Sequence, residues 1–540
     1  MPTPSQIPEI PLTDSPGTWL RRAAAFIDRR SGALIAGFIT LAILLRLLQW
    51  YHSRSLWFDE AVLALNLIER DYLSLARPLD YDQAAPAGFL ALLKLASSVF
   101  GTGERAFRLI PVLAGILAFP LFHLFLRRHA SPLQQLAGIV LLATSYTHLL
   151  HSIMMKQYAP DALAGIVLCL LLPPLLTSPL TPSRFALYTV TGCLAVWFSH
   201  PSTFVLASFG LVAIVHSLHL RDWKKALWTS LMAAFWLASF GGLYLLSVSA
   251  DAQNAYLLQF WSRYFAPFPF HDTASFLWYP WSFFDLFRFT CGYTFPGIAT
   301  GLFIVGVCHR WLANRPLCLA LLGPLAFALL ASALRLYAFG DRLMLFWLPI
   351  LIFFMAEGLA TLAESRLHLG FALAALFGAL LCVHPTVDVV TMLKRPYLLE
   401  ESRPVLRHVE RSLVPGDDIY LYYGAVAAFR YYQTQGILAG AQPIEGYSFG
   451  MVPSRPSVAF VESRNARSHW KLYLEDLDRL RSRKRVWVVF SHLYKRAEIS
   501  EEQFFLDHLN SFGRQISRFE AEGASAYLFN FSASPDATQH

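Results

Sequence analysis

Two adjacent carboxylates, Asp59 and Glu60, stand in the aromatic sequence Trp57-Phe58-Asp59-Glu60-Ala61, a few residues after the first long apolar run. Lysine, arginine or tryptophan anchors the end of a membrane span better than a carboxylate does, so the span does not need this pair. A carboxylate there could take a proton from a hydroxyl or amine as that group attacks a sugar's anomeric carbon. The alternative interpretation is that both residues only cap and solvate an interfacial helix.

Cationic residues recur in later loops that the topology below places on the same side of the membrane. Lys156 lies in the short sequence Lys156-Gln157-Tyr158, and Arg335 and Arg342 flank a later loop. Such groups stabilise the charge that grows on a phosphate leaving group; one charge pair 4 Å apart is worth about 4 kcal/mol at an effective dielectric constant near 20. The alternative interpretation is that each side chain reaches a lipid headgroup phosphate, as arginine and lysine do at membrane surfaces.

Further polar residues are weaker candidates. Those that could line a substrate cavity with the groups above are Asp82, Gln83, Tyr337 and His200. His148, His151 and His200 share one face and would allow a divalent metal, but their spacing is not that of a ligand motif, so no metal site is predicted. The six cysteines fall in or beside apolar runs without a CxxC pair, which supports neither a disulfide framework nor zinc.

The composition indicates which elements must position these residues. Of 540 residues, 55% are hydrophobic and only 15% are charged, with a mean hydropathy of +0.44, whereas a soluble protein carries about 25% charge. Apolar runs of about 20 residues recur, long enough to cross roughly 30 Å of hydrocarbon as helices. The sequence predicts a mainly α, polytopic membrane protein of about eleven spans: 33–50, 106–126, 133–150, 159–176, 185–199, 203–219, 226–248, 290–307, 317–334, 343–362 and 369–383.

Short basic loops fix the expected orientation. Arg127 with Arg128, Arg184, and Lys224 with Lys225 fall in every second loop between the spans, and so on one side of the membrane. Loops rich in arginine and lysine stay in the cytoplasm. This pattern also accounts for the net charge of +8 without nucleic-acid binding. We therefore expect a cytoplasmic segment at 1–30, a transmembrane domain at 31–387, and outer loops at 51–105 and 249–289, of which the first carries the catalytic candidates.

The C-terminal part, residues 388–540, has a different pattern and should form a small extracytoplasmic α/β domain. Strands are predicted at 419–423 and 486–490, and a hairpin around Gly523 from 516–522 and 525–531. Helices are predicted at 398–413 and 470–483, and a capping box at 500–503 should open another helix. Nothing in this part resembles a complete active site.

Four short segments, taken in order, resemble the GT-C membrane glycosyltransferases. They are Trp57-Phe58-Asp59-Glu60-Ala61, the Gln83…Pro86…Phe89-Leu90 segment, Gly101…Glu104…Arg108-Leu109…Pro111, and Tyr337-Ala338-Phe339-Gly340-Asp341-Arg342-Leu343. The resemblance is to bacterial relatives of the protein O-mannosyltransferases and aminoarabinose transferases, with the membrane domain of rhizobial lipopolysaccharide glycosyltransferases. Many relatives have two prolines where this chain has Ala85-Pro86, a departure that bears on substrate geometry.

The resemblance implies a role for each matching residue. Asp59, with Glu60 beside it, matches the catalytic base; Lys156 and Tyr158 match a basic residue and tyrosine of the second outer loop; and Arg342 matches a position implied in phosphate contact. The donor would be a sugar on a polyprenyl phosphate, transferred with inversion to a lipid, protein or polysaccharide acceptor at the outer face of the bacterial inner membrane. No cofactor is firmly implied.

Two other classes of function remain open from the sequence. A lipid or sugar transporter or flippase would carry ionisable residues deep in its spans and broken helices in repeated halves, and the sequence shows few such charges and no repeat. A noncatalytic envelope-assembly protein would bind a partner through the C-terminal domain and would tolerate loss of Asp59 and Arg342.

Overall fold

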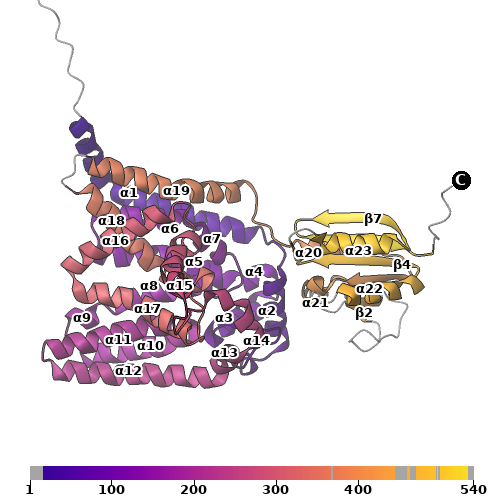
Figure 1. Cartoon of the computed structure of the whole chain (residues 1–540), viewed down its shortest axis with the longest axis horizontal. Coiled ribbons are helices and arrows are strands. Elements are labelled where there is room, and N and C mark those ends of the chain that lie inside the picture. Colours follow the sequence, from indigo (N-terminus) through magenta and orange to yellow (C-terminus); the bar gives the residue numbers. More distant parts are fainter. Residues whose placement is uncertain are drawn as a thin grey trace, which may run out of the picture.

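The computed structural model describes residues 16–365, 369–443, 459–462, 470–493, 495–496 and 499–532. They form an apolar helical bundle and a smaller sheet domain that lies against one end of it (Figure 1). The first half of the predicted N-terminal segment, residues 1–15, lies outside the described residues. The second half is helical and continuous with the first span, since α1 runs from Pro16 to Tyr51.

Helices occupy all eleven predicted spans in the described part of the chain, and nine segments are long and apolar enough to cross a membrane. These nine are α1, α5 (Leu109–His129), α8 with α9 (Tyr158–Leu171, Pro174–Thr177), α11 (Ser202–His219), α12 with η2 and α13 (Trp223–Leu243, Tyr244–Val248, Ser249–Gln253), α16 (Pro296–Ala313), α17 (Arg315–Ala333), η5 with α18 (Asp341–Trp347, Leu348–Ala363) and α19 (Gly370–Lys394). The other two, α6 (Pro132–Thr144) and α10 (Pro182–Phe198), are shorter. The polytopic, mainly α fold is confirmed.

Several boundaries differ from the prediction for local reasons. The predicted span 133–150 is broken because Ser145 is extended and its Oγ accepts a hydrogen bond from the His148 N–H at 3.3 Å, which caps a separate helix α7 (Tyr146–Ser152). The predicted span 369–383 was too short: helix α19 begins at Gly370 and continues through Pro385 to Lys394, a length of 25 residues. The predicted span 290–307 begins later, at Pro296, the first residue of α16.

The loops at the sheet-domain end of the bundle are largely helical. The first loop (51–105) carries α2 (Phe58–Glu69), η1 (Ser74–Ala76), α3 (Ala87–Phe100) and α4 (Glu104–Phe107). The second outer loop (249–289), which is rich in aromatic residues and is called the aromatic loop below, carries α14 (Ala255–Phe260), η3 (Ser262–Tyr264), α15 (Thr273–Asp285) and most of η4 (Leu286–Thr290). Gly101, at φ +83°, ends α3 in a conformation that favours glycine. Helices α2, α3, α4 and α14 lie at the right of the bundle in Figure 1, the end nearest the sheet domain.

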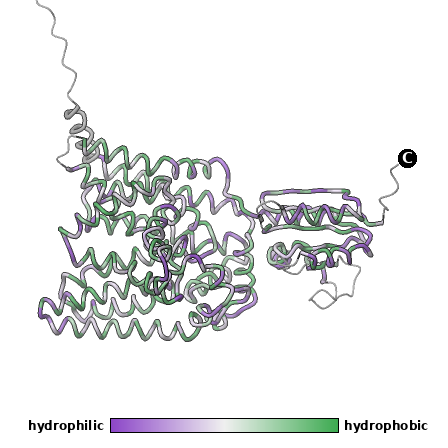
Figure 2. The backbone as a smooth tube through the Cα atoms, in the orientation of Figure 1, coloured by the Kyte–Doolittle hydropathy of each residue, from purple (hydrophilic) through white to green (hydrophobic). Residues whose placement is uncertain are grey.

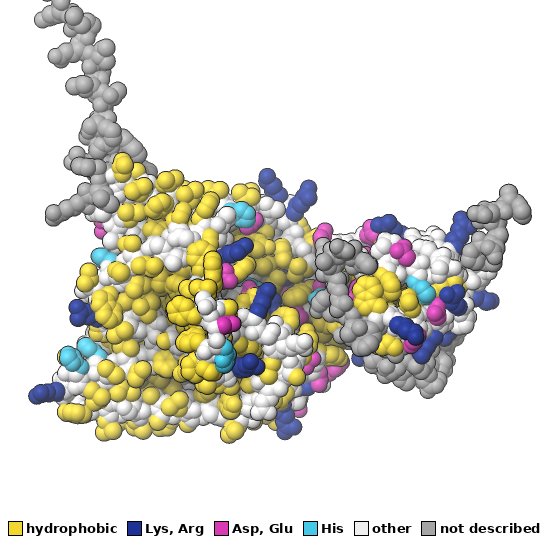
Figure 3. All heavy atoms as spheres, in the orientation of Figure 1, with side chains coloured by type: hydrophobic (Ala, Val, Ile, Leu, Met, Phe, Trp, Pro, Cys, Tyr) yellow, Lys and Arg dark blue, Asp and Glu magenta, His cyan; other side chains and the backbone are white. Residues whose placement is uncertain are grey.

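The bundle is apolar inside and out. Every residue of α18 from Leu348 to Ala360 is buried, so this helix forms the centre of the core. Leu41, Leu187 and Leu237 are among many large apolar side chains exposed on other helices. Figure 2 shows that most of the helical bundle is built from hydrophobic residues, and Figure 3 shows hydrophobic side chains over much of its visible face. Because no water-soluble surface would be so apolar, this surface faces lipid.

In the described part of the sheet domain, six strands form the main sheet, in the order β2-β3-β1-β4-β8-β7, and β5 (Lys495–Arg496) pairs with β6 (Ile499–Ser500) separately. The six are β2 (Gln442–Pro443), β3 (Ala459–Glu462), β1 (Asp417–Leu421), β4 (Arg485–Ser491), β8 (Ala524–Asn530) and β7 (Arg514–Ala521). Strands β2, β3, β1 and β4 are parallel, and β8 joins β4 and β7 in antiparallel pairs. The predicted strands at 419–423 and 486–490 and the hairpin around Gly523 are therefore present.

Helices cover both faces of this sheet. Side chains of α20 (Ser402–Ser412) and α21 (Val426–Thr434) belong to one apolar cluster, and those of α22 (Trp470–Asp478) and α23 (Glu501–Asn510) to another. The predicted helices are present with shorter bounds. Ser500 precedes α23 as expected but makes no side-chain capping bond. The face with α20 and α21 shares its apolar cluster with α2 and α3, so the sheet domain and the first loop pack as one unit.

Candidate functional site

Helix α2 places Asp59 at the bundle end that faces the sheet domain. Asp59 is in the first turn, and its side chain is 25% exposed. The Lys156 ammonium lies 3.7 Å from Asp59 Oδ2 and donates a hydrogen bond of 2.7 Å to Gln83 Oε1. Two positions of the first loop therefore meet at one cationic group from the segment before α8.

Arg342 lies beside this pair. Its guanidinium carbon is 5.7 Å from the centre of the Tyr158 ring and 5.2 Å from that of Trp261. The Arg342 Nε is buried and has no hydrogen-bond partner among the described residues. A half-buried guanidinium with an unused buried Nε donor, held between two rings, is suited to binding the oxygen of an anion.

Lys156 and Arg342 bring two positive charges close together. Burial lowers the pKa of Lys156, while Asp59 raises it and the nearby Arg342 lowers it further. The Asp59 carboxylate acts on both cations, and the Asp341 carboxylate also acts on Arg342. Because an anion between Lys156 and Arg342 would relieve their repulsion, the site favours a negatively charged ligand.

Glu60 does not share the partly exposed position of its neighbour, contrary to the prediction that both carboxylates belong to the chemistry. It is fully buried and pairs with Arg108 through Nε, at 3.1 Å, and through Nη2. Arg54 lies 3.5 Å from Oε1, and the Met155 N–H donates to the same oxygen at 2.7 Å. Burial alone would raise the pKa of Glu60, but Arg108 and Arg54 hold it below its ordinary value. Glu60 therefore fixes the backbone next to Lys156.

The other residues predicted to line a substrate cavity, Asp82, Tyr337 and His200, make different contacts from one another. Asp82 Oδ1 accepts a 2.7 Å hydrogen bond from Asn254 Nδ2 at the start of α14, which links the first loop to the aromatic loop. The Tyr337 hydroxyl donates to the Leu343 carbonyl at 2.6 Å, next to Arg342. His200 is inside the protein, and its Nε2 has no partner among the described residues.

Arg335 is not part of the cluster, contrary to the prediction that it contacts phosphate. It is exposed just after α17, and no contact joins it to Asp59, Lys156 or Arg342 in the described part of the chain. The two other histidines differ in their surroundings: His148 Nδ1 lies 2.8 Å from Nη2 of Arg46, whereas His151 packs edge-on against Tyr158 and is close enough to Arg342 to interact with its charge. The described residues hold no group of three metal-ligating side chains.

Sequence reasoning missed the residues that support the cluster. Arg54 and Arg108 neutralise Glu60, Trp261 flanks Arg342, and Asn254 binds Asp82. Arg108 did stand in one of the segments that resemble GT-C enzymes, but nothing local distinguished it from a membrane anchor. Trp261 is one of fifteen aromatic residues in the loop 249–289, so nothing in the sequence singled it out.

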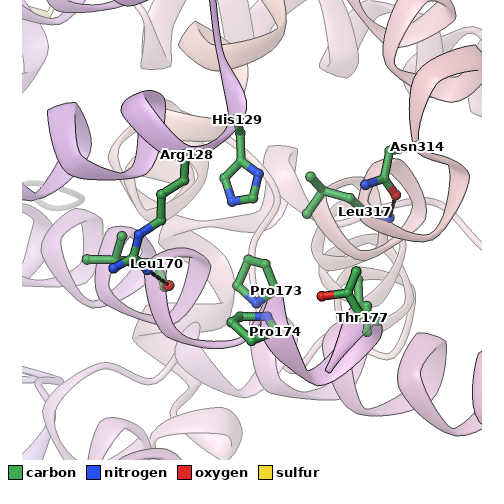
Figure 4. Close-up of a pocket in the computed structure, with 9 residues that line it drawn as sticks. Arg128, His129, Leu170, Pro173, Pro174, Thr177, Asn314 and Leu317 are labelled. Carbon is green, nitrogen blue, oxygen red and sulfur yellow. Dashed lines mark hydrogen bonds between the residues drawn. The ribbon is translucent and has the colours of Figure 1, made fainter. Parts of the chain in front are cut away.

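A small pocket of about 110 Å³ lies at the opposite end of the bundle (Figure 4). Arg128 and His129 at the end of α5, Pro174 and Thr177 after α8, and Asn314 before α17 line it. The Asp59 site instead involves the beginning of α8 and the loop before α5, so this pocket is separate from it.

A bundle of this kind, with interfacial helices in its loops and a C-terminal sheet domain, is the GT-C fold of membrane glycosyltransferases. The chain matches the crystal structure of ArnT, the aminoarabinose transferase, from Cupriavidus metallidurans in the apo state with a TM-score of 0.51 at 12% identity, covering 93% of this chain and 99% of ArnT. ArnT bound to undecaprenyl phosphate gives 0.51 and 12%, covering 92% and 98%. The oligosaccharyltransferase of Archaeoglobus fulgidus in the apo form gives 0.48 and 11%, covering 95% and 75%.

No protein-family model and no curated protein sequence matches the chain. The structural likeness to ArnT confirms the predicted GT-C fold.

Proposed function

We propose that this protein is a glycosyltransferase that takes a sugar from a polyprenyl-phosphate carrier. The observation that carries the proposal is the meeting of Asp59, Lys156 and Arg342, which come from three loops, at one end of a GT-C bundle. A proton acceptor beside an anion-binding pair is what displacement of a lipid phosphate requires. ArnT, which shares the fold, has been crystallised with undecaprenyl phosphate.

In the proposed reaction, an acceptor hydroxyl or amine attacks the anomeric carbon of the donor sugar. The new bond forms as the bond from that carbon to the phosphate oxygen breaks, and the acceptor's proton passes to the Asp59 carboxylate. The electron pair of the broken bond stays on the polyprenyl phosphate, where Lys156 and the Arg342 guanidinium stabilise the added charge. Asp59 is the general base, and Lys156 and Arg342 are donor-binding residues.

One attack from the face opposite the phosphate inverts the anomeric centre. A double displacement would need a second carboxylate close to the first. The neighbouring carboxylate, Glu60, is fully buried and bound by two arginines and a backbone N–H. These contacts support a single displacement with inversion.

The reaction would occur at the outer face of a bacterial inner membrane, in a multi-pass protein with its sheet domain outside the cytoplasm. Arg127, Arg128, Lys224 and Lys225 lie at the ends of spans away from the Asp59 site, and basic residues mark the cytoplasmic side. The prenyl chain of the donor would lie along the lipid-facing surface of the bundle, with the acceptor entering from the outside as a lipid, protein or polysaccharide. Membrane lipids are the other expected partners.

Mass spectrometry of envelope glycolipids and glycoproteins from a deletion strain tests the proposal. One sugar modification should disappear, return with the wild-type gene, and stay absent with Asp59→Asn at equal expression. Glu69→Gln, at the exposed far end of α2, is the matched control and should restore the product. A deletion strain with an unchanged set of envelope products, or full restoration by Asp59→Asn, would contradict the proposal. Transport of a lipid or sugar by purified protein in vesicles, without a transfer product, would identify a flippase instead.

A further inference from the structure

The N-terminal end of α2 is bonded by side chains from the sheet domain. Trp57, the residue that precedes α2, provides no side-chain cap of its own. Three backbone N–H groups at or just before the start of α2 instead donate to the sheet domain: Phe58 N to Glu400 Oε2 at 2.8 Å, Leu56 N to the Tyr432 hydroxyl at 3.0 Å, and Ser55 N to Glu401 Oε1 at 3.1 Å. The helix that carries Asp59 is therefore capped from a distant part of the chain.

Glu400 is itself held in place. His492, just after β4, lies with Nδ1 2.7 Å from Glu400 Oε1, and its ring stacks on Phe58 with 4.5 Å between ring centres. The side chains of Glu400 and His492 are 11% and 20% exposed. One carboxylate thus joins the sheet domain to the residue directly before Asp59.

Glu401 and Arg403 form a second connection between the sheet domain and the first loop. Glu401 Oε2 accepts a 2.9 Å hydrogen bond from Ser55 Oγ, and the Glu401 N–H donates to the Glu522 carbonyl at the turn between β7 and β8. Arg403 donates to the Ser53 carbonyl at 2.7 Å and to Glu104 Oε1 at 2.8 Å. Glu401 and the first turn of α20 are therefore bonded to the sheet on one side and to the first loop on the other.

Apolar packing fixes the same interface. Buried side chains of α2 and of the sheet domain form one cluster, to which Leu56, Val62 and Leu65 contribute from the first loop and Val405, Tyr431 and Trp487 from the sheet domain. Figure 1 shows α20 and α21 as the sheet-domain helices nearest the bundle. Because the interface is buried and both charged and apolar, the sheet domain cannot move without moving α2.

We infer that Glu400 and Glu401 are positioning residues, through which the sheet domain holds α2 in the rotation that keeps Asp59 beside Lys156. A carboxylate at a helix N-terminus stabilises it by hydrogen bonding and by charge. Displacement of a catalytic group by about 1 Å can cost about a hundredfold in rate. This inference rests on the proposed transfer reaction only for its effect on activity; the capping of α2 is tested independently.

Hydrogen exchange of the full-length protein in lipid nanodiscs tests the capping. In Glu400→Ala and Glu401→Ala, exchange of the amides at 55–62 should be about tenfold faster than in the wild type. Glu400→Gln keeps an acceptor oxygen and should restore much of the protection. Glu410→Ala is the matched control, because Glu410 bonds the Leu438 N–H within the sheet domain and should leave α2 unchanged. Unchanged exchange at 55–62 in both alanine variants would overturn the inference.

An assay of sugar transfer tests the expected effect of these residues on catalysis. The probe is donor extracted from wild-type membranes. The kcat of Glu400→Ala should fall about tenfold with the donor KM unchanged, since the donor-binding residues are intact, and Glu410→Ala should keep the wild-type kcat. Faster exchange with an unchanged kcat would overturn the positioning role and leave the proposed function standing. A wild-type protein without transfer activity would overturn the proposed function, and the exchange result would still decide whether the sheet domain holds α2.

Discussion

Asp59 and Glu60 are sequence neighbours in the first turn of α2, yet the Asp59 side chain is 25% exposed beside Lys156, and that of Glu60 is wholly buried against Arg108 and Arg54. Consecutive residues of an α-helix point about 100° apart, so one turn can present one carboxylate to a cleft and the other to the protein interior. We therefore propose separate roles for the two acids, with Asp59 as the general base and Glu60 as a structural ion-pair partner.

Removal of the Asp59 charge should abolish transfer without unfolding the protein. We expect Asp59→Asn to lower kcat by about 10²–10⁴-fold, because the amide cannot take the acceptor's proton. Donor binding should persist, measured with radiolabelled or fluorescent polyprenyl phosphate in nanodiscs. A variant with more than a tenth of wild-type kcat would refute Asp59 as the base.

Arg342 and Arg335 allow a matched comparison of two arginines from one loop. Arg342→Lys should weaken donor binding about tenfold, because an ammonium loses the planar donors and the ring contacts that place the guanidinium between Tyr158 and Trp261. Arg335→Lys, at an exposed position, should change the donor Kd by less than about twofold. Equal effects of the two substitutions would contradict the assignment of Arg342 to the donor phosphate.

The spans and the strands of the sheet domain could be read from the sequence because hydrophobic period and turn residues are local signals. The break at Ser145 could not, since a serine within an apolar run is compatible with a continuous span. The same limit applied to Asp59 and Glu60, whose difference depends on Arg54, Arg108 and Met155. It applied also to Arg335, which was grouped with Arg342 because the two share a loop.

Glu60 should contribute to stability rather than to chemistry. Breaking a buried ion pair leaves its partner charges uncompensated, so Glu60→Gln should destabilise the protein by about 3–5 kcal/mol, measured by thermal unfolding in detergent.

The pKa of Glu60 is held below its ordinary value of 4.5. Its stabilisation is therefore fully present above pH 4.5 and is lost as the pH falls below that value through the folded-state pKa. The stability difference between wild type and Glu60→Gln should be constant from pH 6 to 8 and should shrink below about pH 4.5; a constant difference to pH 3 would contradict the buried ion pair.

Lys156 should set an alkaline limit on donor binding. Burial lowers the pKa of Lys156 from its ordinary value of 10.5, and Asp59 only partly opposes this. The ammonium therefore loses its proton at a lower pH than an exposed lysine would, and the donor phosphate then loses one of its two cations. We expect kcat/KM for the donor to fall as the pH rises toward 10, mainly through KM.

Lys156→Arg is the control for this limit, because a guanidinium stays charged across the accessible range. This variant should retain donor binding and lose the alkaline fall in kcat/KM. If wild type and Lys156→Arg show the same fall, a group other than Lys156 titrates there. Lys156→Met should have a raised donor KM at every pH, since it removes the charge altogether; a wild-type KM in that variant would exclude Lys156 from the donor site.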